Sequence, residues 1–222
     1  MSSLWTAFVH PISRATRRRR AKEIVGLFPR FNQSKVLDLG GSRHFWEKME
    51  GILEPADLTV LNIADDGQAM GISEASLPNM KIELYDGSTI PYPDGFFDIV
   101  ICNSVIEHVP PSQRKRVMEE IKRVGKSFIV QTPSLSFPIE PHFVMPFVHW
   151  LPRPIGKKLV RFGLYAVLTR FPQEKLDSYF EEVNLLSKKE LVDYAPNAKL
   201  LTERFLLMPK SYTLVSLDQR AA

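Results

Sequence analysis

The chain has 222 residues, 44% of them hydrophobic and 24% charged, with a net charge of +4, which excludes a disordered or fibrous protein and predicts one globular domain over 1–222. Its single cysteine, Cys102, excludes an internal disulfide and fits a cytoplasmic protein, and no Cys/His spacing typical of zinc ligands occurs, so we expect no metal site. No run of about 20 apolar residues is present, which excludes a membrane-spanning helix.

Residues 1–30 predict a basic helical arm. A helix is expected over 12–29, because apolar residues recur with helical spacing before Pro29. The apolar stretch 4–9 is too short for a signal peptide and precedes the cations. The cations of this arm are Arg14, Arg17, Arg18, Arg19, Arg20 and Lys22. They form either a solvated helix face or a surface for an anionic partner, which would be an anionic membrane or RNA.

Five short apolar runs follow, each of which predicts a buried parallel strand. The first run ends at Gly40 and Gly41. The predicted strands cover 36–39, 58–62, 81–85, 97–102 and 127–131. Helices are expected between them at 45–53 and at 112–124, where Ser112 is the predicted N-cap and Gly125 ends the helix. This alternation predicts a doubly wound α/β fold with a mostly parallel sheet.

The pattern changes after the fifth strand. Residues 132–180 are rich in proline and aromatic residues and predict a helical insertion that binds the acceptor. Residues 181–222 predict a closing helix, which begins near Ser187 in a capping-box sequence, and then two strands. The strands 200–207 and 212–217 are joined so tightly that they predict an antiparallel hairpin.

Glycine and polar residues stand where the predicted parallel strands end, which is where open α/β sheets bind ligands. Gly40 and Gly41 allow a close approach of backbone to ligand. Asn62 ends the second strand 22 residues after Gly40, about where a ribose-binding side chain is expected. The spacing does not match G-x-G-x-x-G, since Ser42 and Phe45 occupy the later glycine positions. This argues against a dinucleotide-dependent oxidoreductase.

Two segments, VLDLGGS and YDGSTIPYPDGFFDIVICNSVIEHVP, together resemble the motifs of class I S-adenosylmethionine-dependent methyltransferases, in particular the small-molecule branch. The resemblance covers the cofactor-binding core, 36–131. It implies a Rossmann-like fold with a seven-stranded sheet, a closing antiparallel hairpin and S-adenosyl-L-methionine as the cofactor.

The resemblance also implies roles for single residues. Asp38, Gly40 and Gly41 would shape the loop around the methionine moiety. Asn62 would face the ribose. The remaining cofactor contacts would be Asp86 to the adenine amine, Gly87 through its backbone, and Asn103 and Ser104 near the sulfonium. Two positions depart from the family pattern: Ser42 replaces a glycine, and Asn62 replaces an acidic residue unless Asp65 takes that role.

Two histidines are candidates on the acceptor side. His108 matches a Glu-His pair of the family and is either catalytic or a local orienting residue. His142 follows the fifth strand and is either a base or acceptor-binding residue, with Glu140 as its partner, or a residue that fixes a turn beside prolines. A looser resemblance links the run around His142 to methyltransferases of bacterial glycan and lipid-linked-sugar gene clusters. Basic residues beside apolar ones in 143–168 predict either a packed lid or peripheral contact with anionic lipid.

We therefore expect methyl transfer to an oxygen or nitrogen of a small molecule, such as a glycan or lipid-linked sugar. One alternative is an RNA methyltransferase that uses the basic arm, although no RNA-binding module is recognisable and we expect no nucleic-acid partner. The other is a non-catalytic, cofactor-binding scaffold, which the changes at Ser42 and Asn62 keep open.

Overall fold

The computed structural model describes residues 18–63 and 79–217. Its main sheet has seven strands in the order β3-β2-β1-β4-β5-β9-β8. The strands are β1 (Lys35–Leu39), β2 (Asp57–Ile63), β3 (Met80–Tyr85), β4 (Phe97–Asn103), β5 (Gly125–Pro133), β8 (Lys199–Phe205) and β9 (Met208–Ser216). The first five are parallel, and β9 runs antiparallel to both β5 and β8. The predicted doubly wound sheet with a closing hairpin is confirmed.

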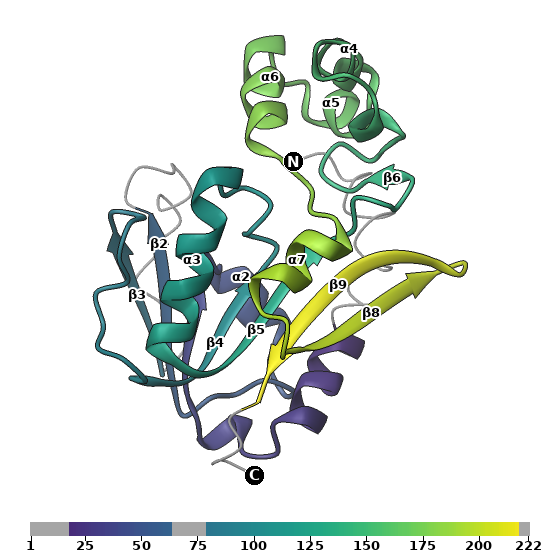
Figure 1. The fold of residues 1–222 in the computed structure, drawn as a ribbon. Helices are drawn as coiled ribbons and strands as arrows, with labels where there is room; N and C mark the ends of the chain where they lie inside the picture. The colour runs from purple at the N-terminus through teal and green to yellow at the C-terminus, as the bar shows by residue number, and fades with distance from the viewer. Residues whose placement is uncertain (1–17, 64–78, 218–222) are drawn as a thin grey trace.

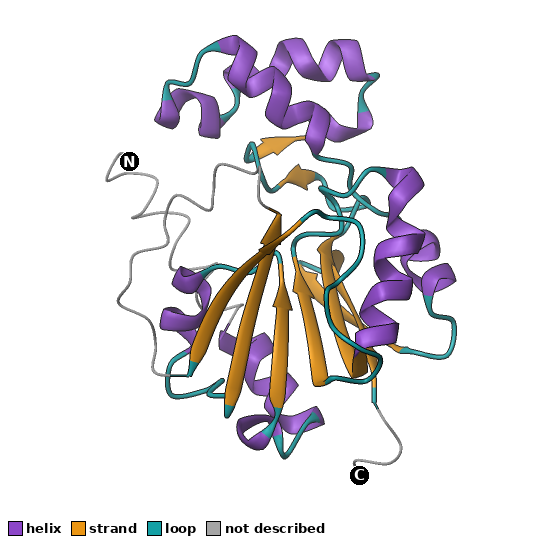
Figure 2. Ribbon diagram, turned by 90° about the vertical axis from the view of Figure 1, so that its left-hand side faces the viewer, coloured by secondary structure: helices purple, strands orange, loops and turns teal. Residues whose placement is uncertain are grey.

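The strand order reverses between β1 and β4. Asp38 of β1 lies opposite Val60 of β2 on one side and Ile101 of β4 on the other. The connections that leave β1 and β4 therefore run in opposite directions along the sheet. Between them they leave a crevice at the carboxyl ends of these two strands. The fold therefore places the candidate site at the edge toward which the parallel strands point (Figure 2).

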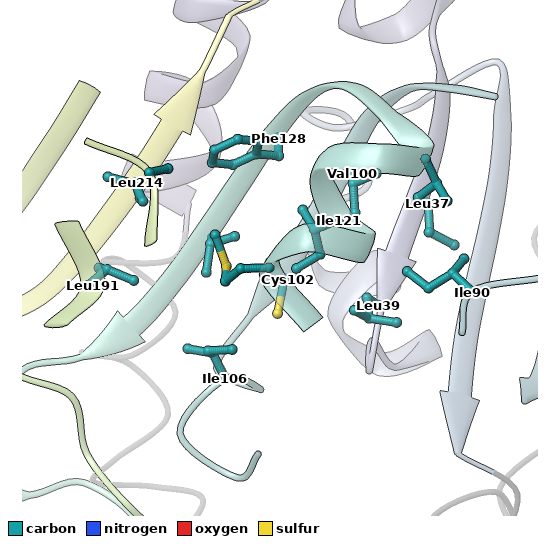
Figure 3. Close-up of a cluster of buried hydrophobic side chains, with 14 of the residues drawn as sticks. Leu37, Leu39, Ile90, Val100, Cys102, Ile106, Ile121, Phe128, Leu191 and Leu214 are labelled. Carbon is teal, nitrogen blue, oxygen red and sulfur yellow. The ribbon is translucent and has the colours of Figure 1, made fainter. Parts of the chain in front are cut away.

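Side chains of the central strands alternate between two cores, as expected for a sheet covered on both faces. Val100 and Cys102 of β4 face α3 (Pro111–Val124) and α7 (Lys188–Tyr194), and Figure 3 shows part of this cluster. On this face, Ile121 from α3 packs among the strands.

The other face of the sheet is covered by the helix 18–27 and by α2 (Arg43–Met49) (Figure 1). Ile99 and Ile101 of β4 point toward these helices, and Trp46 of α2 is 2% exposed among them. Within the described residues, no helix combines the length and hydropathy needed to cross a bilayer.

Two predicted helix details differ from the structure. Ser112 is not the N-cap of α3: the helix begins at Pro111, whose fixed φ and missing N–H suit the first helical position, and Pro110 precedes it without a side-chain cap. The helix α2 ends at Met49, before the predicted limit. By contrast, Ser187 caps α7 as predicted, since its hydroxyl accepts a hydrogen bond from the Glu190 backbone N–H at 3.1 Å.

The closing hairpin turns earlier than predicted. Leu206 and Leu207 form the connection, with φ of 47° and 70°, the left-handed region that a tight two-residue hairpin turn requires. Residues 208–211, which contain Pro209 and resemble a turn, belong to β9. Pro209 pairs with Arg204 of β8, directly beyond a register shift between Glu203 and Arg204. A strand tolerates proline at such an irregularity.

The segment between β5 and α7 forms a small helical layer above the carboxyl ends of the parallel strands (Figure 2). Its elements are β6 (Ile139–Glu140), β7 (Met145–Pro146), η3 (Val148–Trp150), α4 (Arg153–Leu159), η4 (Val160–Phe162), α5 (Leu164–Thr169) and α6 (Gln173–Glu182). It has its own core, in which Phe143 is fully buried beside Phe180. This segment therefore roofs the predicted ligand edge of the sheet.

Candidate active site

The loop after β1 contains two glycines, and any other residue at either position would force neighbouring atoms to move. Gly40 has a φ of +70°, and a Cβ there would lie 2.6 Å from Val105 Cγ2. A Cβ on Gly41 would lie 1.8 Å from Asp38 Oδ2. Ser42 needs no such freedom, because its backbone is extended and its hydroxyl accepts from the Phe45 N–H at 3.3 Å, capping α2. The serine at this position is thus compatible with an intact loop.

The Asp38 side chain lies next to Gly41 of this loop. Its side chain is 2% exposed, and Oδ2 accepts a hydrogen bond from Trp46 Nε1 at 2.7 Å. Burial raises the pKa of Asp38 to about 7, although the Trp46 hydrogen bond acts in the opposite direction. Trp46 thus holds the Asp38 carboxylate against Gly41, where a Cβ would collide with Oδ2.

Asn62, at the end of β2, is connected to the same loop. Its Nδ2 donates to the Gly41 carbonyl oxygen at 3.1 Å. A carboxylate cannot donate this hydrogen bond, so the amide that replaces the family's acidic residue has a structural use here. Asp65, the alternative ribose ligand, lies outside the described residues.

Asp86 and Gly87 follow β3. Asp86 is exposed and accepts from the Ser88 N–H at 2.8 Å and from the Ser88 hydroxyl at 2.7 Å. These bonds, the hydroxyl first, lower the pKa of Asp86, so it is a carboxylate at neutral pH with unused acceptor capacity. Gly87 has a φ of +78°, and a Cβ there would lie 3.1 Å from Ile63 Cδ1.

Asn103 is the last residue of β4, and Ser104 begins the loop that follows. Ser104 has a φ of 56°, and its hydroxyl donates to Gln131 Oε1 at 2.9 Å. The Asn103 Oδ1 accepts from Arg20 Nη1 at 3.0 Å, and Arg20 Nη2 also donates to Glu203 Oε2 at 2.8 Å. Arg20 therefore ties the N-terminal helix and the hairpin to the end of β4.

This role of Arg20 was missed in the sequence, where the residue is one of a run of cations. The available signal was its spacing: Arg20 precedes Ile24 by four residues and adjoins Ala21, and both of these apolar residues are buried.

Above the end of β4, the two predicted histidines come together. The rings of His108 and His142 lie 5.0 Å apart at 88°, and Tyr179 of α6 contacts both. The predicted partner of His142 is in place, since Glu140 Oε1 lies 2.6 Å from Nδ1. Glu140 is itself held by the Phe143 N–H, which donates to Oε2 at 2.7 Å.

Glu107 joins these histidines, although the sequence did not single it out. It is 0% exposed, and Thr132 donates to Oε2 at 3.0 Å, while Oε1 is buried and has no hydrogen-bond partner in 18–63 or 79–217. Burial raises the pKa of Glu107 to about 7. Burial, followed by the nearby His142, lowers the pKa of His108 to about 4. Burial alone would lower the pKa of His142, but the hydrogen bond that its ring donates to Glu140 and the charge of that carboxylate raise the pKa overall.

A cavity of about 300 Å³ lies between the helical layer and the α3 side of the sheet. Glu140 and Phe143 line it, together with the buried Arg114. Because Glu140 also contacts His142, one carboxylate borders both the cavity and the histidine pair.

Residues 37–127 match the family model of a methyltransferase domain. Over its cofactor-binding core, the chain therefore has the methyltransferase domain that its motifs predict. Its cofactor is S-adenosylmethionine. The sequence has no significant match among curated protein sequences.

Solved structures share the fold of this methyltransferase. A methyltransferase from Archaeoglobus fulgidus superposes with a TM-score of 0.55 at 11% identity, covering 91% of this chain and 93% of the other. One from Mesorhizobium loti gives a TM-score of 0.54 at 10% identity, with 87% and 94% covered. A Haloferax volcanii chain, solved in complex with the methyltransferase activator Trm112, gives a TM-score of 0.52 at 11% identity, with 96% and 95% covered.

The glycine loop of the methyltransferase fits its cofactor. A Cβ at Gly40 would collide with Val105 and a Cβ at Gly41 with Asp38, so this loop can hold its conformation only with glycine at both positions, as in loops that bind a ligand through their backbone. Asn62, Asp86 and Ser104 end the neighbouring strands along the same edge of the sheet.

Proposed function

We propose that this methyltransferase methylates an oxygen nucleophile, or a nitrogen in its place, of a small molecule bound beneath the helical layer. The observation that carries the proposal is that Glu107 and His108, in the loop after β4 that begins at Ser104, meet His142 of the helical layer. Ordinary hydroxyls do not lose their protons at neutral pH, and such a polar cluster next to the cofactor is what activation of a hydroxyl needs.

The cofactor, when bound, supplies a methyl group already activated by the sulfonium. The task of the chain is then to hold donor and acceptor in line. We assign the methionine moiety to the loop of Asp38, Gly40 and Gly41, the ribose to Asn62, and the adenine amine to Asp86. Ser42 and Gly87 would contribute backbone, and Asn103 and Ser104 would border the sulfonium. Glu140 and His142 would meet the acceptor, and the cavity beside Glu140 would hold its remainder.

Titration calorimetry with S-adenosylmethionine and S-adenosylhomocysteine tests the cofactor assignment. Asp86→Ala is expected to weaken both ligands at least about tenfold, because a hydrogen bond to a charged acceptor contributes roughly 1.5–3 kcal/mol. Asp193→Ala is the matched control, as Asp193 forms an exposed ion pair with Lys189 on α7. Equal affinities in the wild type and the Asp86 variant would refute the adenine assignment.

A lipid-linked sugar is the acceptor class favoured by the surface of the helical layer. Phe162 and Val167 are 62% and 60% exposed there. The guanidinium of Arg161 lies 4.7 Å above the Phe162 ring, and Lys158 is exposed nearby. Cations beside exposed apolar side chains suit contact with an anionic membrane. The RNA alternative receives less support, because Arg20 of the basic run is bound within the protein and Arg19 pairs with Glu23 at 3.3 Å.

Vesicle sedimentation distinguishes a membrane face from a packed lid. We expect the wild type to co-sediment with phosphatidylglycerol vesicles and less with phosphatidylcholine vesicles, and the double variant Phe162→Ser/Val167→Ser to lose about tenfold in partitioning, since each removes apolar area from the interface. Leu217→Ser is the control, because Leu217 is 44% exposed at the opposite edge of the sheet. If the wild-type protein co-sedimented with neither type of vesicle, the proposed membrane contact would be ruled out.

A further inference from the structure

We propose that Glu107, His108 and His142 form a binding site for a divalent first-row transition-metal ion, which would hold the acceptor hydroxyl next to the cofactor. One ligand atom from each residue, a carboxylate oxygen or a ring nitrogen, lies within 4.8 Å of the other two. The inference deepens the proposed function and rests on it for the identity of the acceptor group.

The Glu107 carboxylate is the strongest observation. Its side chain is completely buried, and Thr132 satisfies only Oε2. Oε1 has no hydrogen-bond partner among the described residues. A buried carboxylate oxygen without a donor costs free energy, and native structures rarely retain one unless a ligand or ion satisfies it. A cation between Glu107 and the two histidines would satisfy it.

His142 is oriented as a metal ligand usually is. Glu140 Oε1 lies 2.6 Å from its Nδ1, so this nitrogen carries the proton and Nε2 presents its lone pair. The Phe143 N–H fixes Glu140 in turn, at 2.7 Å. A histidine whose second nitrogen donates to an anchored carboxylate is the common outer-shell arrangement of protein metal sites.

The ligand set indicates the kind of ion. Two imidazoles and one carboxylate suit Zn²⁺, Mn²⁺ or Fe²⁺ more than Mg²⁺ or Ca²⁺, which prefer oxygen ligands. Ligands on Zn²⁺ at about 2.1 Å lie roughly 3.4 Å apart, so ligand atoms that lie within 4.8 Å of one another need to approach by up to about 1.4 Å. Three protein ligands leave an open position for an exogenous oxygen.

That open position gives the site its use. An alcohol oxygen bound to the ion would lose its proton to solvent water more readily than a free alcohol. The oxygen then attacks the methyl carbon, a C–O bond forms, and the C–S bond breaks with its electron pair remaining on sulfur. The products are the methyl ether, S-adenosylhomocysteine and one released proton. Glu107 and His108 lie three and four residues after Ser104 at the carboxyl end of β4, and His142 reaches them from the helical layer.

Direct metal binding tests the proposal without any assay of activity. The full chain is treated with EDTA, dialysed and titrated with Zn²⁺ by calorimetry and with Co²⁺ by visible absorption. We expect one ion per chain. Glu107→Gln and His142→Gln should each weaken binding more than tenfold, and Glu140→Gln about 10- to 100-fold through loss of orientation. His149→Gln is the matched control, since its Nε2 lies 3.1 Å from the Leu135 carbonyl oxygen outside the cluster.

The outcomes separate this inference from the proposed function. Metal-free protein that binds S-adenosylmethionine and methylates a hydroxyl at the full rate would overturn the metal site and leave the methyltransferase assignment intact. Equal Zn²⁺ affinity in the wild type and Glu107→Gln would overturn it as well. Stoichiometric Zn²⁺ that depends on Glu107 and His142 would support the site even if no hydroxyl acceptor were methylated, which would count against the proposed acceptor class alone.

Discussion

Gly41→Ala is expected to reduce the affinity for S-adenosylmethionine by about 100-fold. The new Cβ would lie 1.8 Å from Asp38 Oδ2, and this carboxylate cannot easily move because it is buried and bound to Trp46 at 2.7 Å. The loop has to shift instead, which also disturbs the hydrogen bond from Asn62 to the Gly41 carbonyl oxygen. A 100-fold loss of affinity corresponds to about 2.7 kcal/mol, which is roughly what two or three lost hydrogen bonds to the ligand contribute. Titration calorimetry measures the effect.

Gly26→Ala provides the control for this substitution. Gly26 lies in the helix 18–27, and a Cβ there meets no atom within 4 Å, so the alanine should be neutral or slightly stabilising. Thermal unfolding of both variants separates loss of binding from loss of folding. A folded Gly41→Ala protein with wild-type affinity would show that the cofactor does not depend on this loop.

The sheet could be predicted because its central strands are buried on both faces. Such strands are continuous apolar runs that end abruptly. In β4, Val100 and Cys102 belong to the core on one face of the sheet, and Ile99 and Ile101 belong to the core on the other face. The fold class, the enzyme class and the cofactor predicted on this basis and from the family resemblance are confirmed. The hairpin connection was wrong because Leu206 and Leu207 adopt positive φ, which leucine rarely does and no sequence rule would assign to it.

Positions that depart from the family pattern could not be judged without coordinates. In the sequence, Ser42 and Asn62 stand where the family has a glycine and an acidic residue, which suggests that two cofactor-binding residues are lost. In the structure, Ser42 caps α2 and Asn62 donates to the glycine loop, so each replacement makes a contact of its own. The roles of these residues toward the cofactor stay predictions.

The acceptor side was the least accessible to sequence reasoning. Glu107 and His142 are 35 residues apart and lie in two different connections, so their proximity depends on how the helical layer folds back over the sheet. Tyr179, from a third segment, contacts both histidine rings. A metal site assembled in this way has no local ligand spacing, which is why the sequence predicted none.

His142→Ala is expected to lower the rate of methyl transfer by about 10²- to 10⁴-fold, the range associated with loss of a group that acts on a transferred proton. S-adenosylmethionine binding should be unchanged, because His142 lies in the helical layer and contacts Glu140 and Tyr179 instead of the glycine loop. The measurement is S-adenosylhomocysteine production with a panel of nucleotide sugars and lipid-linked sugars.

Two further variants serve as a control for His142→Ala and as a test of the residue that positions His142. Gln173→Ala removes an exposed polar side chain of the same layer, away from the histidines and the cavity, and should retain the wild-type rate. Glu140→Gln should lower kcat with little change in KM for the cofactor, since Glu140 acts by holding the His142 ring. If His142→Ala and Gln173→Ala had the same rate on an acceptor that the wild type methylates, the Glu140–His142 pair would be a structural contact. Activation of the acceptor would then have to come from another group at the end of β4, with Glu107 and His108 the nearest candidates.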